Sequence, residues 1–574
     1  MRSLRGSDRE NTEEEKDRER FTRSSRSHSS MTPRRGVNKQ NTEESRKGGL
    51  PSRCVLCQFF FVSSVLNSLP PSEGVDTALS PCSARRRVAP AKHAVLLPLA
   101  ALLMSLASLC ARDYPPDVPA PKPVTLPTPA VKILPNGLRV VAIERHSLPV
   151  VTLRMVVKAG AEADPPELPG AAQFVAGLLD EGTAGRSAQE TAQAIDQVGG
   201  AIQTGAEWDS SFVELSVLTD HSELAFDLVS DMIIRPAFAP AEVERGRKQT
   251  LSSLEIMRED PAYLADAVFN RVELSGTPYG HSADGTPESI RRLSERDLRD
   301  FHARYYLPSN AILAVVGDIS ADDAFRRAEK FFGNWQGSAQ SDPPARRSVP
   351  SPPVSRDSSR QVVVIDMPDA VQTEIRIGNT GIPRDSPDYY ALTVANQILG
   401  GPATNRLFKA LRSQHGLAYG ASSDLVCHET AGSWEAKTST RTPETLKSVQ
   451  LVLEQMKRLR DHPIADWELD ATRGYLNGHM ALEFETSEGI ATQVLDLLIH
   501  SLPLDYWSRF PERVRDLSAQ DVWNTARARL DPDRAVIVMV GNVAGFRKEL
   551  KKLGPVRIIP LQRVDLASAD LERQ

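Results

Sequence analysis

The chain has 574 residues, of which 40% are hydrophobic and 25% charged, and its formal net charge is −5. This length exceeds that of one ordinary domain, and the composition is that of a globular protein. The weak negative charge, with no basic stripe interleaved with aromatic residues, argues against nucleic acid as a partner. Four of the five cysteines lie at or before residue 110, which excludes a disulfide-scaffold protein.

The N-terminal region divides into three parts. Residues 1–84 are rich in Arg, Ser and Glu without sustained apolar periodicity, which predicts disorder. Residues 85–111 join three arginines to an apolar run and small residues, a pattern typical of a signal peptide and short for a membrane span. Because such a segment normally begins a protein, we expect residues 1–84 to be a misassigned extension. We also expect export, to the periplasm, with membrane attachment only if this segment stays uncleaved. Residues 112–130 form a Pro-rich lead-in.

From residue 131 to residue 336 the sequence predicts a first globular half. Strands are expected at 131–134, 138–143 and 150–157, followed by a helix over Gly170–Thr183. Further helices are expected at 189–198, 224–233, 240–258, 293–306 and 321–332, and further strands at 201–205, 212–219 and 311–316. Thr286 before Pro287 predicts a helix start, with Thr286 as the N-cap.

A Ser-, Pro- and Arg-rich linker at 337–360 separates this half from a second one at 361–555, and 556–574 is a tail. The second half is expected to hold strands at 361–365, 372–377, 417–423 and 534–542, and helices at 389–399, 407–412, 442–460 and 465–483. Its strand Arg-Ala-Val-Ile-Val-Met-Val-Gly-Asn echoes Asn-Ala-Ile-Leu-Ala-Val-Val-Gly-Asp of the first half, which indicates an internal repeat of roughly 200 residues. The expected fold is α+β: two homologous halves, each a mainly antiparallel sheet flanked by helices, forming a clamshell around a cavity.

Four segments carry a family resemblance, and they follow one another in the family's order. They are Gly170–Thr183, Pro278–Ile290 (P-Y-G-x-x-x-x-G-T-P-E-S-I), Tyr305–Ala311 before a Val-Val-Gly-Asp strand, and Leu399–Tyr419. Together they resemble the M16 family of zinc peptidases, which includes insulinase, pitrilysin and the mitochondrial processing peptidase. The resemblance spans about residues 131–555, nearly the whole globular region.

The zinc-binding residues of that family are missing. An H-x-x-E-H helix places two imidazoles on one face, with a Glu between them as general base. Its three slots hold Gln173, Ala176 and Gly177 here. The resemblance further assigns the third zinc ligand to Ser253 and an auxiliary Glu to Gly246. We therefore expect no metal or other cofactor in this chain.

Two other interpretations of this helix remain. It can be simply a helix packed against the sheet, or part of a different metal site that uses Asp180, Glu181 or Glu190. No histidine stands nearby to complete such a site. The histidines of the globular region form no i, i+4 pair, and we expect most of them at the surface or in loops.

The family's Arg-x6-Tyr motif is present, as Arg412 and Tyr419. The resemblance implies that this pair binds substrate and supports the transition state at the zinc of the opposite half. A guanidinium and a phenol can each donate hydrogen bonds to a peptide carbonyl or a developing oxyanion. The alternative is that Arg412 is a surface helix residue and that Tyr419 packs in the core.

Two functions of different class follow. In the first, this is the non-catalytic, Arg/Tyr-bearing subunit of a heterodimeric zinc metallopeptidase that degrades peptides, and the partner, an M16 subunit with intact H-x-x-E-H, holds the zinc. In the second, it is a non-hydrolytic structural or peptide-binding M16-like subunit. An autonomous metalloendopeptidase is a distant third.

Overall fold

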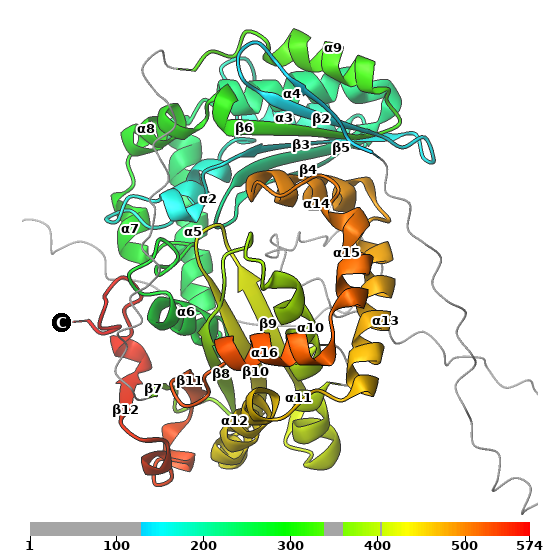
Figure 1. The fold of residues 1–574 in the computed structure, drawn as a ribbon. Helices are drawn as coiled ribbons and strands as arrows, with labels where there is room; N and C mark the ends of the chain where they lie inside the picture. The colour runs from blue at the N-terminus through cyan, green and yellow to red at the C-terminus, as the bar shows by residue number, and fades with distance from the viewer. Residues whose placement is uncertain (1–127, 338–359, 402–404, 574) are drawn as a thin grey trace, which may run out of the picture. The chain divides into compact units, whose positions relative to one another are not determined.

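Two six-stranded sheets carry the fold of the computed structural model, which describes residues 128–337, 360–401 and 405–573 (Figure 1). The first sheet has the order β1-β2-β6-β3-β5-β4, and the second has the order β12-β7-β11-β8-β10-β9. The first comprises β1 (Ala130–Ile133), β2 (Arg139–Glu144), β3 (Val150–Val157), β4 (Ala201–Ala206), β5 (Ser211–Leu218) and β6 (Ala311–Gly317). The second comprises β7 (Gln361–Asp366), β8 (Gln372–Thr380), β9 (Ala418–Cys427), β10 (Gly432–Arg441), β11 (Val536–Gly541) and β12 (Val556–Pro560).

The two sheets repeat one pairing scheme. In each, one central pair is parallel, β2 with β6 and β7 with β11, and the following strands alternate in direction out to the edge strand β4 or β9. The sheets differ at the other edge, where β1 is antiparallel to β2 but β12 is parallel to β7. The predicted internal repeat and the mainly antiparallel α+β class are therefore confirmed.

Fifteen α-helices lie between these strands in the described ranges. In the first half they are α2 (Ala171–Ala176), α3 (Ala188–Asp196), α4 (Ser222–Ile234), α5 (Pro240–Arg258), α6 (Pro261–Glu273), α7 (Pro287–Arg292), α8 (Glu295–Tyr305) and α9 (Ala321–Phe332). In the second half they are α10 (Tyr389–Gly400), α11 (Arg406–Phe408), α12 (Thr445–Asp461), α13 (Asp466–Glu483), α14 (Ser487–Ile499), α15 (Tyr506–Asp516) and α16 (Ala519–Arg529). The expected cap at Thr286 is confirmed, because its side chain accepts from the backbone N–H of Ser289.

The sequence interpretation was wrong about several elements. The helix expected over Gly170–Thr183 ends at Ala176, where Gly177 caps it. Strand β10 and helices α6, α14, α15 and α16 were not anticipated. Helix α6 begins only two residues after α5 ends, since Asp260 caps it through the N–H of Ala262 and Pro261 fits its first turn.

Other expectations fall outside the described residues. These concern the extension at 1–84, the signal-peptide segment at 85–111, most of the lead-in and most of the linker. Within the described part, no helix is both long enough and apolar enough to cross a membrane.

Helix α6, which belongs to the first half of the sequence, packs on the second sheet. It contacts β8 and β11, and its Leu264, Val268 and Phe269 share a buried apolar cluster with residues of β7 and β11. The Nε of Arg376, on β8, donates to Asp266 Oδ1 of this helix at 2.6 Å. One face of the second sheet is thus covered from the first half.

Helix α14, from the second half, makes the reciprocal contact. It packs on β3 and β6, while α4 and α9 cover the opposite face of that first sheet (Figure 1). The hydroxyls of Thr152 and Ser216 donate to Glu488 Oε1 at 3.1 and 2.8 Å. All the described residues fall within one compact unit. The enclosed cavity between the halves stays a prediction.

Truncating the α6 contact tests this packing. Phe269 is fully buried, so Phe269→Ala removes apolar contacts and leaves a cavity. We expect a loss of about 4 kcal/mol in the free energy of unfolding, measured by urea denaturation followed by circular dichroism. Val371→Ala, at a side chain that is 83% exposed, should change it by less than about 0.5 kcal/mol. Equal effects of the two substitutions would contradict the packing of α6 on the second sheet.

Candidate functional site

The position of the family's zinc helix is held by α2, a helix anchored by a buried acid. Asp164 accepts from the backbone N–H groups of Gly170 at 2.6 Å and Ala172 at 2.8 Å, which satisfies two free donors at the start of the helix. Gln173 uses its amide Oε1 to accept from the N–H of Ala206 on β4 at 2.8 Å. Ala176 is fully buried in the core. Gln173 therefore ties this helix to the sheet through an amide, and neither Gln173 nor Ala176 offers a zinc ligand.

Helix α5 supplies the opposing positions. Gly246 faces α2 closely, because a Cβ placed there would lie 3.2 Å from Leu178 Cδ2 and 3.7 Å from Phe174 Cε2. Ser253 lies two helical turns further along and is exposed. An amide, a methyl group, a glycine and a hydroxyl do not make a zinc ligand set, which requires imidazole, thiolate or carboxylate. The residues present at these positions do not fit the metal.

The acidic residues of the alternative metal site are engaged in separate interactions. Asp180 accepts from the Thr204 hydroxyl at 3.4 Å, and burial raises the pKa of Asp180 to about 6. Glu181 pairs with Arg245, and Glu190 completes the N-terminal capping box of α3 with Ser187. Across the described ranges, no group of three or more His, Cys, Asp or Glu side chains could hold a metal ion.

The Arg412 and Tyr419 side chains lie together on the surface. Asn405 is the N-cap of helix α11, and its side chain accepts from Phe408 N at 2.7 Å. The helix continues as a π-helical turn over Lys409–Gln414. Gly416 then adopts a φ of +60°, which lets the chain reverse into β9. The Arg412 guanidinium carbon lies 4.8 Å from the Tyr419 ring centroid and 4.9 Å from that of Phe408.

The exposure of Tyr419 decides between the two interpretations of this pair. The side chain is 85% exposed, so the alternative in which it packs in the core is wrong. No carboxylate among the described residues forms an ion pair with Arg412. The structure thus presents a guanidinium and a phenol, both hydrogen-bond donors, side by side to solvent. Their role toward a substrate stays a prediction.

Comparison with known proteins identifies the family. The model of the insulinase family (peptidase family M16) matches residues 139–279, and that of the peptidase M16 inactive domain matches residues 292–476. The chain belongs to the M16 family. It is an M16-like homologue of the inactive type, in agreement with the missing ligands at Gln173, Ala176, Gly177 and Ser253.

Individual M16 relatives agree with this assignment. The chain is 28% identical over 354 residues to an uncharacterized zinc protease of Mycobacterium leprae, covering 62% of this chain and 78% of that protein. It is 24% identical over 405 residues to a Helicobacter pylori protein named non-peptidase homolog YmxG, covering 70% and 90%. The crystal structure of a peptidase M16 inactive domain from Pseudomonas fluorescens superposes with a TM-score of 0.66 and 27% identity, covering 72% and 97%.

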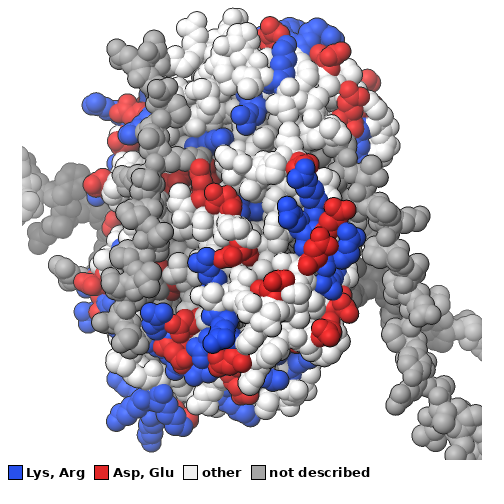
Figure 2. Space-filling model, in the orientation of Figure 1, with Lys and Arg blue, Asp and Glu red and all other residues white. Residues whose placement is uncertain are grey.

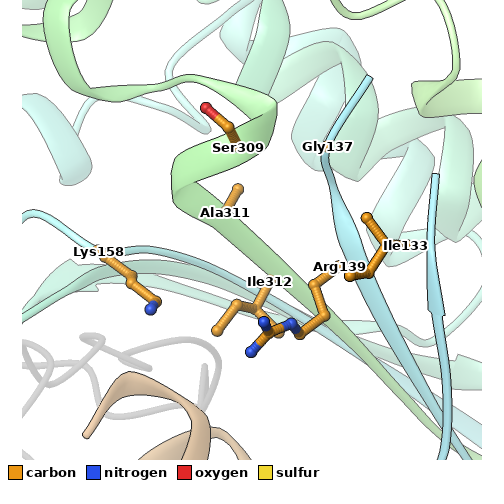
Figure 3. Close-up of a pocket in the computed structure, with 7 residues that line it drawn as sticks. All are labelled: Ile133, Gly137, Arg139, Lys158, Ser309, Ala311 and Ile312. Atoms are coloured by element: carbon orange, nitrogen blue, oxygen red, sulfur yellow. The ribbon is translucent and has the colours of Figure 1, made fainter. Parts of the chain in front are cut away.

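The pocket drawn in Figure 3 lies elsewhere in this M16 fold. It opens beside β2 and β6, with the side chains of Arg139, Lys158 and Ser309 at its wall (Figure 3). Its volume of about 70 Å³ suits a few water molecules and is too small for a peptide. Over the surface in view, positive and negative side chains lie side by side (Figure 2).

A buried polar network joins the two halves, and it was missed in the sequence. Asp209, between β4 and β5, accepts from the Tyr279 hydroxyl at 2.7 Å and from the N–H of Glu429 at 3.2 Å. His500 Nε2 lies 3.5 Å from Asp209 Oδ2, the oxygen that accepts from Glu429, and His500 Nδ1 lies 3.0 Å from Asp496 Oδ1. The expectation of surface histidines is wrong for His500, whose side chain is 9% exposed. No sequence spacing could have indicated this contact, because its partners are hundreds of residues apart.

The charge state of His500 follows from these neighbours. Burial lowers its pKa, but the neighbouring carboxylates of Asp209 and then Asp496 outweigh burial and raise the pKa of His500 to about 9. A histidine whose folded pKa lies above its unfolded value of 6.5 stabilises the fold fully below that value. The stabilisation is lost as the pH rises through about 9.

Removing this charge gives a pH-dependent prediction. His500→Gln leaves the buried carboxylate of Asp209 without its charged partner, while Asp496 keeps its ion pair with Arg384, so we expect a loss of about 3 kcal/mol in the free energy of unfolding at pH 6. The difference from the wild type should shrink as the pH rises through about 9, because wild-type His500 then loses its proton. Urea titrations across this pH range measure it. His462→Gln, at an exposed histidine, serves as the control and should change stability by less than about 0.5 kcal/mol. A pH-independent difference would refute the charged state of His500.

Proposed function

We propose that this chain is the non-catalytic subunit of a two-chain M16 zinc peptidase that degrades peptides. The observation that carries the proposal is the contrast between its two candidate sites. The metal position holds Gln173, Ala176 and Gly177, whereas Arg412 and Tyr419 are both present, stacked and exposed. A chain that had lost all function at this site would have no need of an exposed tyrosine under a guanidinium.

The chemistry of the pair supports the proposal. The Arg412 guanidinium and the Tyr419 phenol can each donate a hydrogen bond to a peptide carbonyl, and more strongly to the oxyanion that forms when the carbonyl is attacked. The partner, an M16 subunit with an intact H-x-x-E-H helix, would hold the zinc. Each subunit would then supply what the other lacks.

The test is co-expression of this chain with such a partner. We expect the Arg412→Ala/Tyr419→Phe double variant to lower the peptidase rate of the complex by about 100-fold, because two transition-state donors are lost. The matched control is Arg527→Ala, which removes a guanidinium that lies 5.6 Å from the ring of Trp523 on the surface of α16. The control should leave the rate unchanged, and an unchanged rate in the double variant would refute the proposal.

A second candidate function is a non-hydrolytic structural or peptide-binding M16-like subunit. The printed name of the Helicobacter pylori relative, a non-peptidase homolog, favours it. This function predicts a stable assembly that forms equally well with the wild-type chain and with the Arg412→Ala/Tyr419→Phe variant.

Zinc content separates both candidates from an autonomous metalloendopeptidase. Because Gln173, Ala176, Gly177 and Ser253 offer no ligand set, we expect the purified chain to hold far less than one zinc per chain after dialysis. Atomic absorption measures this. One tightly bound zinc per chain, with peptidase activity that a chelator abolishes, would revive the autonomous enzyme.

A further inference from the structure

The Arg412–Tyr419 pair is one end of a longer array of cations over aromatic rings. The other end is Lys409, whose Nζ lies 4.7 Å from the ring centroid of Trp467. Phe408 precedes Lys409 in the chain, and its ring centroid lies 4.9 Å from the Arg412 guanidinium carbon. We call these five residues, Phe408, Lys409, Arg412, Tyr419 and Trp467, the cation–aromatic strip.

The strip is open to solvent at both aromatic ends. Trp467 is 60% exposed and Tyr419 is 85% exposed. Large aromatic side chains that stay this exposed, each fixed against a cation, are the kind of rigid anchor used in binding surfaces. Single exposed apolar residues need no explanation, but here two exposed rings each lie against a cation of the same short helical segment.

The positive charge of the strip is unpaired within the described part of the chain. Neither Lys409 nor Arg412 forms an ion pair with a carboxylate there. Glu468, on α13, is held by Arg406 through two hydrogen bonds of 2.9 and 2.7 Å. The strip therefore presents two cations that have no ion-pair partner among the described residues.

We propose that the cation–aromatic strip selects acidic segments of unfolded peptides, with Lys409 and Trp467 as specificity-determining residues beyond Arg412 and Tyr419. This inference rests on the proposed function, since it names the substrate class of the same site. A peptide carboxylate pairs with Lys409, and the aliphatic parts of neighbouring residues lie on the exposed rings. The Arg412–Tyr419 end contacts the backbone of any peptide, whereas the Lys409–Trp467 end discriminates by charge.

The test measures binding by the full chain alone. The probes are two fluorescein-labelled unfolded peptides that differ only in having aspartate or asparagine at alternate positions, and fluorescence anisotropy gives their Kd values. We expect the wild-type chain to bind the aspartate peptide about fivefold more tightly. Lys409→Met and Trp467→Ala should each abolish this preference, while Lys409→Arg and Trp467→Phe should retain most of it.

Controls distinguish the strip from general charge effects. Lys548→Met removes an exposed lysine of the segment before β12, at the edge of the second sheet opposite β9, and should leave the preference intact. A preference that survives Lys409→Met, or the absence of binding to either peptide, overturns the inference. So does binding of the chain to anionic phosphatidylserine vesicles that depends on Lys409 and Trp467, because the strip would then serve a lipid surface.

Failure of the proposed function is read separately. If the Arg412→Ala/Tyr419→Phe variant leaves the peptidase rate of the complex unchanged, the two-chain peptidase is refuted, whatever Kd values the two peptides give. If that variant weakens both peptides alike and the aspartate preference persists, the division of roles along the strip is supported.

Discussion

The fold depends on an exchange of helices between its two halves. Helix α6 leaves the first half to cover one face of the second sheet, and α14 leaves the second half to cover one face of the first. A sheet exposed on one face can alternate apolar and polar residues, but these sheets bury apolar residues on both faces, as along β6 and β11. Neither half can therefore satisfy its own sheet. The same exchange brings Asp209 of one half against His500 of the other, so the buried charges depend on the apolar contacts around them.

The residues at the metal-ligand positions make packing and hydrogen-bond contacts in place of metal bonds. Gln173 has a new task, since its amide accepts the N–H of Ala206 at the end of β4. Gly246 allows α5 to lie against Leu178 of the segment that follows α2, and a glutamate side chain there would meet that leucine. Restoring one ligand would leave the others absent and would disturb this packing. These positions are closely packed, so introducing a zinc ligand set would require several coupled substitutions.

The sequence predicted those elements whose apolar pattern and caps agree. Strand β3 and helix α9 were placed at their observed bounds, because a short, mainly apolar run and a helical periodicity, respectively, lie between clear boundaries. Helix α14 (S-E-G-I-A-T-Q-V-L-D-L-L-I) was missed because its apolar residues surround the helix, which contacts both halves. Strand β10 was missed because it carries Glu435 and Lys437, which pair with each other at 2.7 Å inside the fold. For the site, motif spacing singled out Arg412 and Tyr419, whose side chains lie together in the structure. The contact of Lys409 with Trp467 could not be read from spacing, because these two residues are distant in sequence.

The internal repeat lets the two candidate sites be compared at equivalent positions of the two halves. Strands β4 and β9 occupy equivalent edges of the two sheets. At β4 the backbone N–H of Ala206 donates to Gln173 of α2, so the helix at the metal-site position is hydrogen-bonded to the edge strand of its own sheet. At β9 the second residue of the strand, Tyr419, is exposed and lies against the Arg412 guanidinium. Strand β9 is contacted by α10, whose Asn396 donates to the backbone carbonyl of Ser423 at 3.0 Å. The two equivalent edges thus differ at their ends, with the backbone of β4 bound by Gln173 and an exposed tyrosine on β9.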